Sequence, residues 1–529
     1  MDRVKDPTWN PALAVPLIKS TITVPEVLDR FDDQDIIVVD TTGILALRYF
    51  SNIFSVSADS VISFSDQQTS QSYALTVGDV GVLTGSGTVT VPQVNGFVAF
   101  DVSNMTPQPE VHSITFKNGN IVLDVTSQFS FPTDVRVQIP SLTVGSSTYD
   151  QTLTGVTNGN PGQLTIPLTN AILDLTQGNP AYNQIHVIMD MTIHGGSGSG
   201  LPGSSVTVTA SLQGMQFATV IGDMKQQQVQ QTDGEVRIRF FENDTTGNSS
   251  GEIHWADPRV KAIFTNGVGA GVQINITNLN FVSPYNGSNQ LSGTTPLLNN
   301  PTINFNSLIG GTALSIFDVN RTNSNIVTVA DAKPTKLYYG FNALLNPAGG
   351  TNINWLKDTS KVRLDMEVFL PFDGTAKDFR RADTTEVDIF PLNEDVEEIE
   401  SVTFRLTIDN GFPADAHGQV YFYDSTLSAN NPGVLIDSLF QPGRATIFAS
   451  PAVPSSGHVD QSQKVRTTVD ITVDRDLLNK LEANGFRKII ARGWIDTYQL
   501  GSQNVQIYQD YAMDMWLGLM VKAKYRVRL

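Results

Sequence analysis

The chain has 529 residues, of which 40% are hydrophobic and 16% charged, with a formal net charge of −18 and no cysteine. This length favours three or four domains, and the low charged content favours strands and turns over surface helices. The acidic balance argues against nucleic acid and anionic lipid as partners, and the lack of cysteine excludes disulfides and thiolate chemistry.

The chain opens with an apolar stretch, Trp9 to Phe31, that three prolines interrupt. These prolines break every candidate core of a signal peptide, and no run of about 18 apolar residues occurs that could span a membrane as a helix. The segment Thr23 to Glu26 has the form of a capping box, which predicts a short helix to about Phe31. Two strands are then predicted, at Ile36–Val39 and Ile44–Phe50, so we expect a folded helix-plus-hairpin element.

The N-terminal sequence WNPALAVPLIKSTITVPEVLDRF, followed by DTTGILALRYFSNIFS, resembles the mature N-terminus of large cell-envelope proteins of Bacteroidota, many of them lipoproteins. The shared motif is Trp-x-Pro followed by Ala-Val-Pro-Leu. The resemblance implies repeated β-domains and a place in the periplasm, at the outer membrane or on the surface of a Gram-negative bacterium. In such relatives a lipid-modified cysteine precedes the motif. Since this sequence has none, membrane association is expected only through a lipid anchor absent from it.

Alternation of apolar and polar residues dominates the rest of the chain and predicts strands. Three segments share one pattern, a strand, a kink of polar and Gly or Pro residues, and a second strand: Ile121–Leu142, Arg259–Leu279 and Phe404–Asp424. They predict three sandwich-like domains. The alternative is that any β-rich chain contains such hairpins by chance.

The predicted fold is therefore all-β, consisting of elongated multi-domain β-sandwiches that are mainly antiparallel, with a few short helices. The predicted units are an N-terminal helix plus β element (1–110), two β-sandwiches (111–225 and 232–345) and a C-terminal β-domain (346–529). Composition predicts a polar linker at Met224–Gly234, a flexible loop tip at His194–Ser205 and a weaker boundary at Asn346–Asn354. One clear helix is predicted at Asp474–Ala483, capped by Asp474 and ended by Asn484-Gly485.

The C-terminal segment Tyr511–Leu529 alternates strictly and predicts one buried face, with a bend near Gly518 that divides it into two strands. The even positions at its end form a basic row on an acidic protein. These are Lys522, Lys524, Arg526 and Arg528. The row is either a solvated edge that deters strand addition by other chains or a docking site for an acidic partner.

Motifs for catalysis are missing from the sequence. None of the six histidines stands at a metal-ligand spacing from another, and neither a nucleophile elbow nor a phosphate-binding loop occurs. The glycines of Gly267–Gly271 fall between two strands, and the acidic run Asp383–Glu400 is interpreted as a solvated surface. Calcium is a weaker hypothesis, because Asp32-Asp33 and Glu242–Asp244 are equally well explained as turns. We therefore expect no enzyme activity and no catalytic, cofactor-binding or metal residues.

The leading hypothesis is a non-enzymatic structural or binding protein of the cell envelope that acts through protein–protein contacts. One alternative is an accessory or plug subunit of an outer-membrane secretion translocon, which would make an outer-membrane β-barrel its partner. Another is a carbohydrate-binding or carbohydrate-active surface protein, for which an exposed tryptophan such as Trp255 or Trp355 would be the stacking platform. Lipid carriage between two sheets is a further option.

Overall fold

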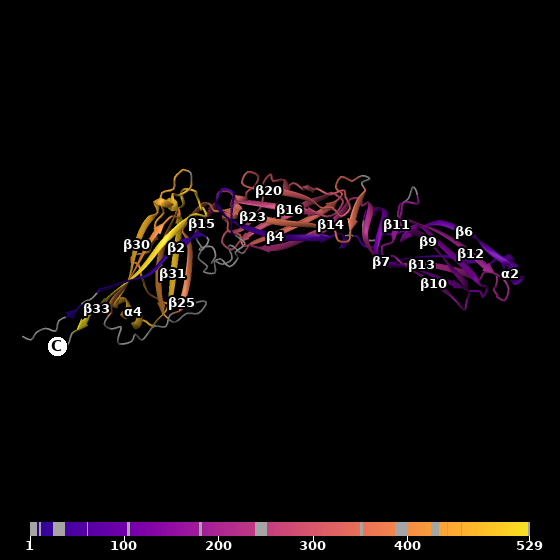
Figure 1. The fold of residues 1–529 in the computed structure, drawn as a ribbon, viewed down its shortest axis with the longest axis horizontal. Coiled ribbons are helices and arrows are strands. Elements are labelled where there is room, and N and C mark those ends of the chain that lie inside the picture. The colour runs from indigo at the N-terminus through magenta and orange to yellow at the C-terminus, as the bar shows by residue number, and fades with distance from the viewer. Residues whose placement is uncertain are drawn as a thin grey trace, which may run out of the picture.

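The computed structural model describes residues 8–9, 12–24, 37–60, 62–102, 106–178, 182–238, 251–349, 353–386, 399–424, 433–441, 443–455 and 457–526. The strands pair antiparallel and form three lobes that lie in a row (Figure 1). We name them the proximal lobe, which holds both ends of the described chain, the middle lobe and the distal lobe. The all-β prediction is confirmed.

The distal lobe is a sandwich of two four-stranded layers. One layer has the order β5 (Gln67–Ala74), β13 (Ser205–Asp223), β7 (Glu110–Ser127) and β10 (Gly162–Pro167). The other has the order β6 (Thr88–Ala99), β12 (Gln184–His194), β8 (Thr133–Val144) and β9 (Ser147–Val156). The short β11 (Ile172–Asp174) joins β7 to β8, and α2 (Val77–Thr84) closes the free end.

The middle lobe repeats this arrangement. One layer contains β3 (Ile37–Val39), β4 (Leu45–Ser57), β23 (Lys361–Pro371), β16 (Arg259–Asn266) and β20 (Ala313–Val319). The other contains β14 (Gln227–Arg237), β21 (Lys336–Leu345), β17 (Val272–Ser283) and β18 (Gly287–Gln290), with β19 (Thr302–Ile303) also on β17. Its helical segments are η1 (Ala58–Ser60), η3 (Pro296–Leu298) and α3 (Ile326–Asp331).

The proximal lobe has the same plan. One layer contains β2 (Ala12–Thr23), β33 (Ala512–Ala523), β26 (Ile399–Asn410) and β30 (Val465–Asp474). The other contains β25 (Phe379–Glu386), β31 (Phe486–Thr497), β27 (Ala414–Asp424), β28 (Leu435–Ser438) and β29 (Ala445–Phe448). Helical segments are η5 (Gln461–Gln463), α4 (Arg475–Ala483) and α5 (Tyr498–Gly501), and β1 (Thr8–Trp9) pairs with β34 (Tyr525–Arg526).

All three lobes share one strand order and are nested within one another. Numbered within a lobe, the layers run 1-8-3-6 and 2-7-4-5, which is the order of a jelly-roll sandwich. The first strands come early in the chain, as β2, β4 and β5 for the proximal, middle and distal lobes. The distal lobe is therefore inserted after the first strand of the middle lobe, and the middle lobe after the first strand of the proximal one. Strands of residues 1–110 consequently pair in all three lobes, while the predicted domain ranges remain a prediction.

The lobes are joined by strand pairing and by shared core. At one junction β22 (Asn354–Lys357) of the middle segment pairs with the end of β13, and a single cluster of buried apolar side chains runs from the distal into the middle lobe. At the other, β15 (Glu252–Trp255), β24 (Asp373–Lys377) and β32 (Val505–Gln506) form a small sheet that connects middle and proximal segments. Burial of apolar surface across a junction opposes hinge motion, so we infer that the row of lobes is stiff.

The three predicted kinks each lie between two strands, as expected, and use the same device. A side-chain oxygen at the end of the first strand accepts a hydrogen bond from the backbone N–H two residues later, the geometry of an Asx or Ser/Thr turn. The bonds run from Phe129 N to Ser127 Oγ (3.2 Å), from Val268 N to Asn266 Oδ1 (3.0 Å) and from Phe412 N to Asn410 Oδ1 (2.9 Å). At each turn the chain crosses from one layer of its sandwich to the other.

Several other predictions can be compared with the described residues. The strands at 36–39 and 44–50 are confirmed by β3 and β4, and the helix with the Asp474 cap is confirmed by α4. The predicted linker at Met224–Gly234 is wrong, because most of it belongs to β14, which pairs with β21. The predicted helix to Phe31 lies outside the described residues.

The bend near Gly518 is also wrong, because β33 runs unbroken from Ala512 to Ala523 and the interruption falls at Lys524. Pairing to β2 on one side and β26 on the other holds Gly518 in an extended strand. The expected burial of one face of this segment holds for Tyr511, which is fully buried, whereas most of β33 is half-buried on both faces.

Candidate interaction surfaces

The predicted basic row lies at the end of the proximal lobe. Lys522 is exposed at the end of β33, and Lys524 is exposed with its Nζ 3.7 Å from Glu400 Oε1. Arg526 lies in β34, where its backbone pairs with Thr8, and Arg528 lies outside the described residues. The structure therefore places two of the four cations on one exposed strand end, and one of them faces a carboxylate.

The N-terminal strand β2 forms the edge of the same sheet. It pairs with β33 along its whole length, with a bulge between Pro16 and Ile18 opposite Gly518. Bulges turn a side chain out of the alternating pattern. Leu17, the extra residue, is 46% exposed, and its neighbour Ile18 is 51% exposed.

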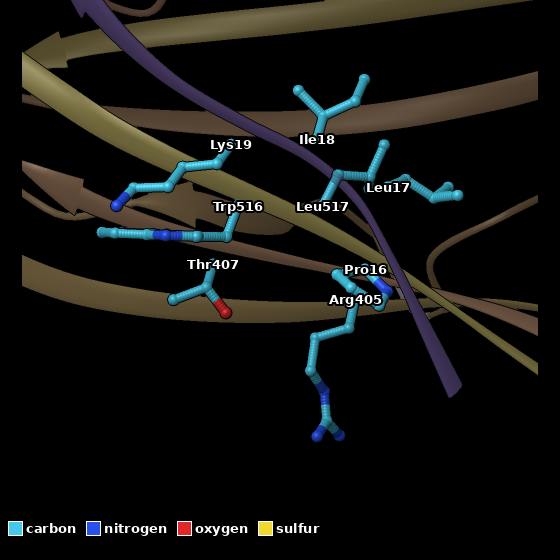
Figure 2. A pocket seen from close by; sticks show the side chains of 9 residues that line it. Pro16, Leu17, Ile18, Lys19, Arg405, Thr407, Trp516 and Leu517 are labelled. Carbon is cyan, nitrogen blue, oxygen red and sulfur yellow. The ribbon is translucent and has the colours of Figure 1, made fainter. Parts of the chain in front are cut away.

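A shallow groove of about 460 Å³ lies over this bulge (Figure 2). Its walls come from β2, β33 and β26, and Gly518 leaves the space between them open. Figure 2 shows the Trp516 ring between Lys19 and Thr407, with the Arg405 side chain leading away from the ring. The remaining lining residues are Pro16, Leu17, Ile18 and Leu517.

The cations around the groove lie near the Trp516 ring or pair with a carboxylate. Lys19 Nζ lies 5.9 Å from the centroid of the Trp516 ring, and the Arg466 guanidinium lies 5.5 Å from it. Both cations are within the range of a cation–π interaction with this ring. Arg405 makes a two-bond pair with Asp470, with its Nε 2.7 Å and its Nη2 2.6 Å from the two carboxylate oxygens. The hydrogen bond from Arg405 lowers the pKa of Asp470 below its usual value.

The groove offers an aromatic ring and aliphatic side chains for contact. Its described polar lining residues are Lys19, Arg405 and Thr407, and it contains no carboxylate or histidine. Sequence reasoning missed it because the prolines served only to exclude a signal peptide, and no strand was predicted for Ala12–Thr23. The available signal was the run of β-branched and aliphatic residues in Ala12–Thr23.

The histidines are dispersed, and four of the six each lie near a single carboxylate. His254 Nδ1 lies 2.7 Å from Asp331 Oδ2, and His194 Nε2 lies 2.9 Å from Asp134 Oδ2, at separate places in the middle and distal lobes. Among the described residues, no group of three His, Asp or Glu side chains converges as a metal site would require. The two candidate calcium turns and most of the acidic run Asp383–Glu400 lie outside the described residues.

The two tryptophans expected to be exposed are buried. Trp255 is 4% and Trp355 is 3% exposed, so neither is a platform for a sugar ring. Trp255 packs in the middle lobe near Phe372, and the Trp355 indole N–H donates to Asn306 O at 3.0 Å. The glycines of the segment 267–271 do lie between two strands, and Trp355 packs directly against Gly269.

Comparison with known proteins assigns no family. No family model matches the chain, and no curated protein matches it. Among solved structures, the chain is similar to a presumed secreted protein from Parabacteroides distasonis, at 11% identity and a TM-score of 0.17, covering 68% of this chain and 99% of that one. It is also similar to the VP2 subviral particle of infectious bursal disease virus, at 8% identity and a TM-score of 0.11, covering 88% and 82%. At these scores neither likeness bears on function, and the resemblance to Bacteroidota envelope proteins remains a prediction.

Proposed function

We propose that this protein is a non-enzymatic structural or binding rod of a bacterial cell envelope that acts through its surfaces. The observation that carries the proposal is the nested row of three sandwiches, in which both ends of the described chain lie in the proximal lobe. A body of this kind holds the distal lobe away from whatever the proximal lobe contacts. Jelly-roll sandwiches host many functions, so the fold alone does not choose among them.

One further observation supports a binding role. Ionisable side chains in the described part of the chain pair with one another at separate places on the surface. Separately, no helix among the described residues is long and apolar enough to span a membrane. The sequence resemblance supports an extracytoplasmic location and an outer-membrane protein as partner. The proximal basic row supports a partner with an acidic surface.

The test is site-specific photo-crosslinking in cells, with the crosslinker at position 522 in the proximal lobe or at the exposed Lys261 in the middle lobe. We expect a discrete protein adduct in the envelope fraction from position 522 and none from position 261. Charge reversal of a neighbour, Lys524→Glu, is expected to weaken the adduct, whereas Lys336→Glu in the middle lobe leaves it unchanged. A protein confined to the cytosol, or equal adducts from both positions, would contradict the proposal.

A further inference from the structure

The free end of the distal lobe is one rigid unit made from two segments. It consists of α2 and the loop 195–204, and we call it the distal tip (Figure 1). The loop begins with a hydrogen bond from Gly196 N to Leu83 O (3.0 Å) and ends with one from Gly203 N to Leu75 O (2.8 Å), so both of its ends are tied to the two ends of the helix. The predicted loop position is confirmed, and these bonds hold the loop in place against the helix.

Local backbone chemistry fixes this tip. A capping box of Thr76 and Asp79 starts α2, and the Tyr73 hydroxyl donates to the same carboxylate at 2.9 Å. In the loop, Ser204 N donates to Leu201 O at 3.0 Å, while Gly203 has a φ of +88°. A turn with Pro at its second position and Gly with positive φ at its third is a stable type II arrangement.

This rigid tip exposes aliphatic side chains. Val77 is 76%, Leu201 74% and Val82 46% exposed. The first two are the most exposed large apolar side chains among the described residues. Such side chains on a well-ordered turn and helix gain free energy when an apolar environment covers them.

The tip is also almost free of charge, on a protein with a net charge of −18. The four connections at this end, residues 75–87, 128–132, 157–161 and 195–204, contain one ionisable side chain, Asp79, whose carboxylate is occupied by the capping box. Without Lys or Arg, the tip cannot recognise anionic lipid or an acidic protein by ion pairing. The distal tip also contains no Trp, Tyr or Arg, the residues that dominate protein–protein affinity.

We propose that the distal tip inserts Val77, Val82 and Leu201 into the boundary layer of an uncharged lipid surface. A bilayer accepts a convex apolar tip without a matching pocket, and its neutral headgroups fit a tip without charge. The inference rests on the proposed function, because a rod that contacts a partner through its proximal lobe can hold the distal tip at a second surface. Binding by three aliphatic side chains is reversible, since each contributes less than a lipid chain would.

Vesicle flotation with phosphatidylcholine tests the proposal on the full chain. We expect the wild-type protein to float with the vesicles, with binding that raised salt leaves unchanged and added anionic lipid weakens. The double variant Val77→Glu/Leu201→Glu is expected to lower the partition coefficient at least about tenfold, since each aliphatic side chain contributes on the order of a factor of ten or more when buried. A milder variant, Leu201→Asn, should lower it in the same direction without adding charge.

Leu308 in the middle lobe provides the matched control, because it is 73% exposed and lies away from the tip. Leu308→Glu is expected to float as the wild type does. Absence of flotation, an equal loss in Leu308→Glu, dependence on anionic lipid, or capture by a protein in place of lipid would each overturn the proposal. Because the crosslinking test of the proposed function probes the opposite end, the two can fail separately.

Discussion

Asn410 shows how much one buried amide contributes at a strand crossover. It is fully buried, and its Nδ2 lies 2.9 Å from Ala449 O and 3.0 Å from both Phe412 O and Ala414 O. Its Oδ1 accepts the hydrogen bond from Phe412 N that forms the turn. The side chain therefore contacts four backbone groups near the core, and its two Nδ2–H donors are shared among the three carbonyls.

We predict that Asn410→Ala destabilises the proximal lobe by roughly 2–4 kcal/mol, because an unsatisfied buried backbone group costs about 1–3 kcal/mol. Denaturant unfolding of the full chain, followed through the transition of this lobe, measures the effect. Asn299→Ala, at an exposed position with one long hydrogen bond, is the control and should change little. A loss below about 1 kcal/mol would show that the crossover does not depend on this amide.

Gly269 is a second position where a single atom decides stability. A Cβ at this residue would overlap the indole ring of Trp355, so Gly269→Ala should cost about 1–3 kcal/mol through overpacking. The double variant Gly269→Ala/Trp355→Leu should be less destabilised than the sum of its parts, since the smaller side chain leaves room. Thermal unfolding of the four members of this cycle checks the coupling, and additive losses would contradict it. Gly96→Ala, with open space around it, is the neutral control.

Local sequence signals predicted some of these features and not others. The polar, Gly and Pro pattern located all three crossovers because a turn is decided within a few residues. Burial of Trp255 and Trp355 could not be predicted, since it depends on segments such as Phe372 and the 304–312 loop that the chain brings in from elsewhere. The same holds for the low charge at the free end of the distal lobe, where the distal tip and two further connections meet.

Ion pairs on the sheet of β2, β33, β26 and β30 make the stability of the proximal lobe depend on pH. Hydrogen bonds from Arg466 and Lys464 lower the pKa values of Asp409 and Asp514, as the bond from Arg405 does for Asp470. A carboxyl group whose pKa is lowered in the folded state contributes stability above its unfolded pKa, about 3.9, and loses it as pH falls through the folded value.

We therefore predict that the unfolding temperature of this lobe falls as pH decreases from about 5 toward 3. The variant Asp409→Asn/Asp470→Asn should show a flatter decrease over that range, since the groups that titrate are gone. Thermal unfolding at a series of pH values measures both slopes. Equal slopes for variant and wild type would mean that these exposed pairs carry no net stability, as many surface pairs do.

Single elements differ in how far local sequence determines them. Helix α4 was predicted because Asp474 caps it and Gly485, with a φ of +66°, ends it, all within one stretch. Strand β14 was predicted as a linker because its composition is polar. It is a strand since β21, about a hundred residues later, supplies the backbone partners. Likewise β2 pairs with β33 across nearly the whole chain, which no local pattern reveals.

The nesting of the lobes predicts which fragments fold. A fragment of residues 62–226 contains all eight strands of the distal lobe and should fold cooperatively, whereas a fragment of residues 227–371 lacks β4 and should not. Adding a peptide of residues 37–60 should restore folding of the second fragment by completing its sheet. Circular dichroism and denaturant unfolding measure whether each fragment folds and whether the peptide restores cooperative unfolding. Cooperative unfolding of residues 227–371 alone would contradict the nested description.

For the whole molecule, the central claim is that three nested sandwiches form one stiff, extended body. The cores of the distal and middle lobes are continuous, and a three-stranded sheet connects the middle and proximal lobes. Such a body separates the proximal contact surface from the distal tip, and both proposed interactions depend on that separation.

Small-angle X-ray scattering of the full chain in solution tests this claim most directly. A compact single domain of this length would have a radius of gyration of about 24 Å. We predict a clearly larger value, with a scattering profile that the extended arrangement of Figure 1 fits without movement between lobes. A radius near about 24 Å, or a profile that requires a population of bent molecules, would contradict the account.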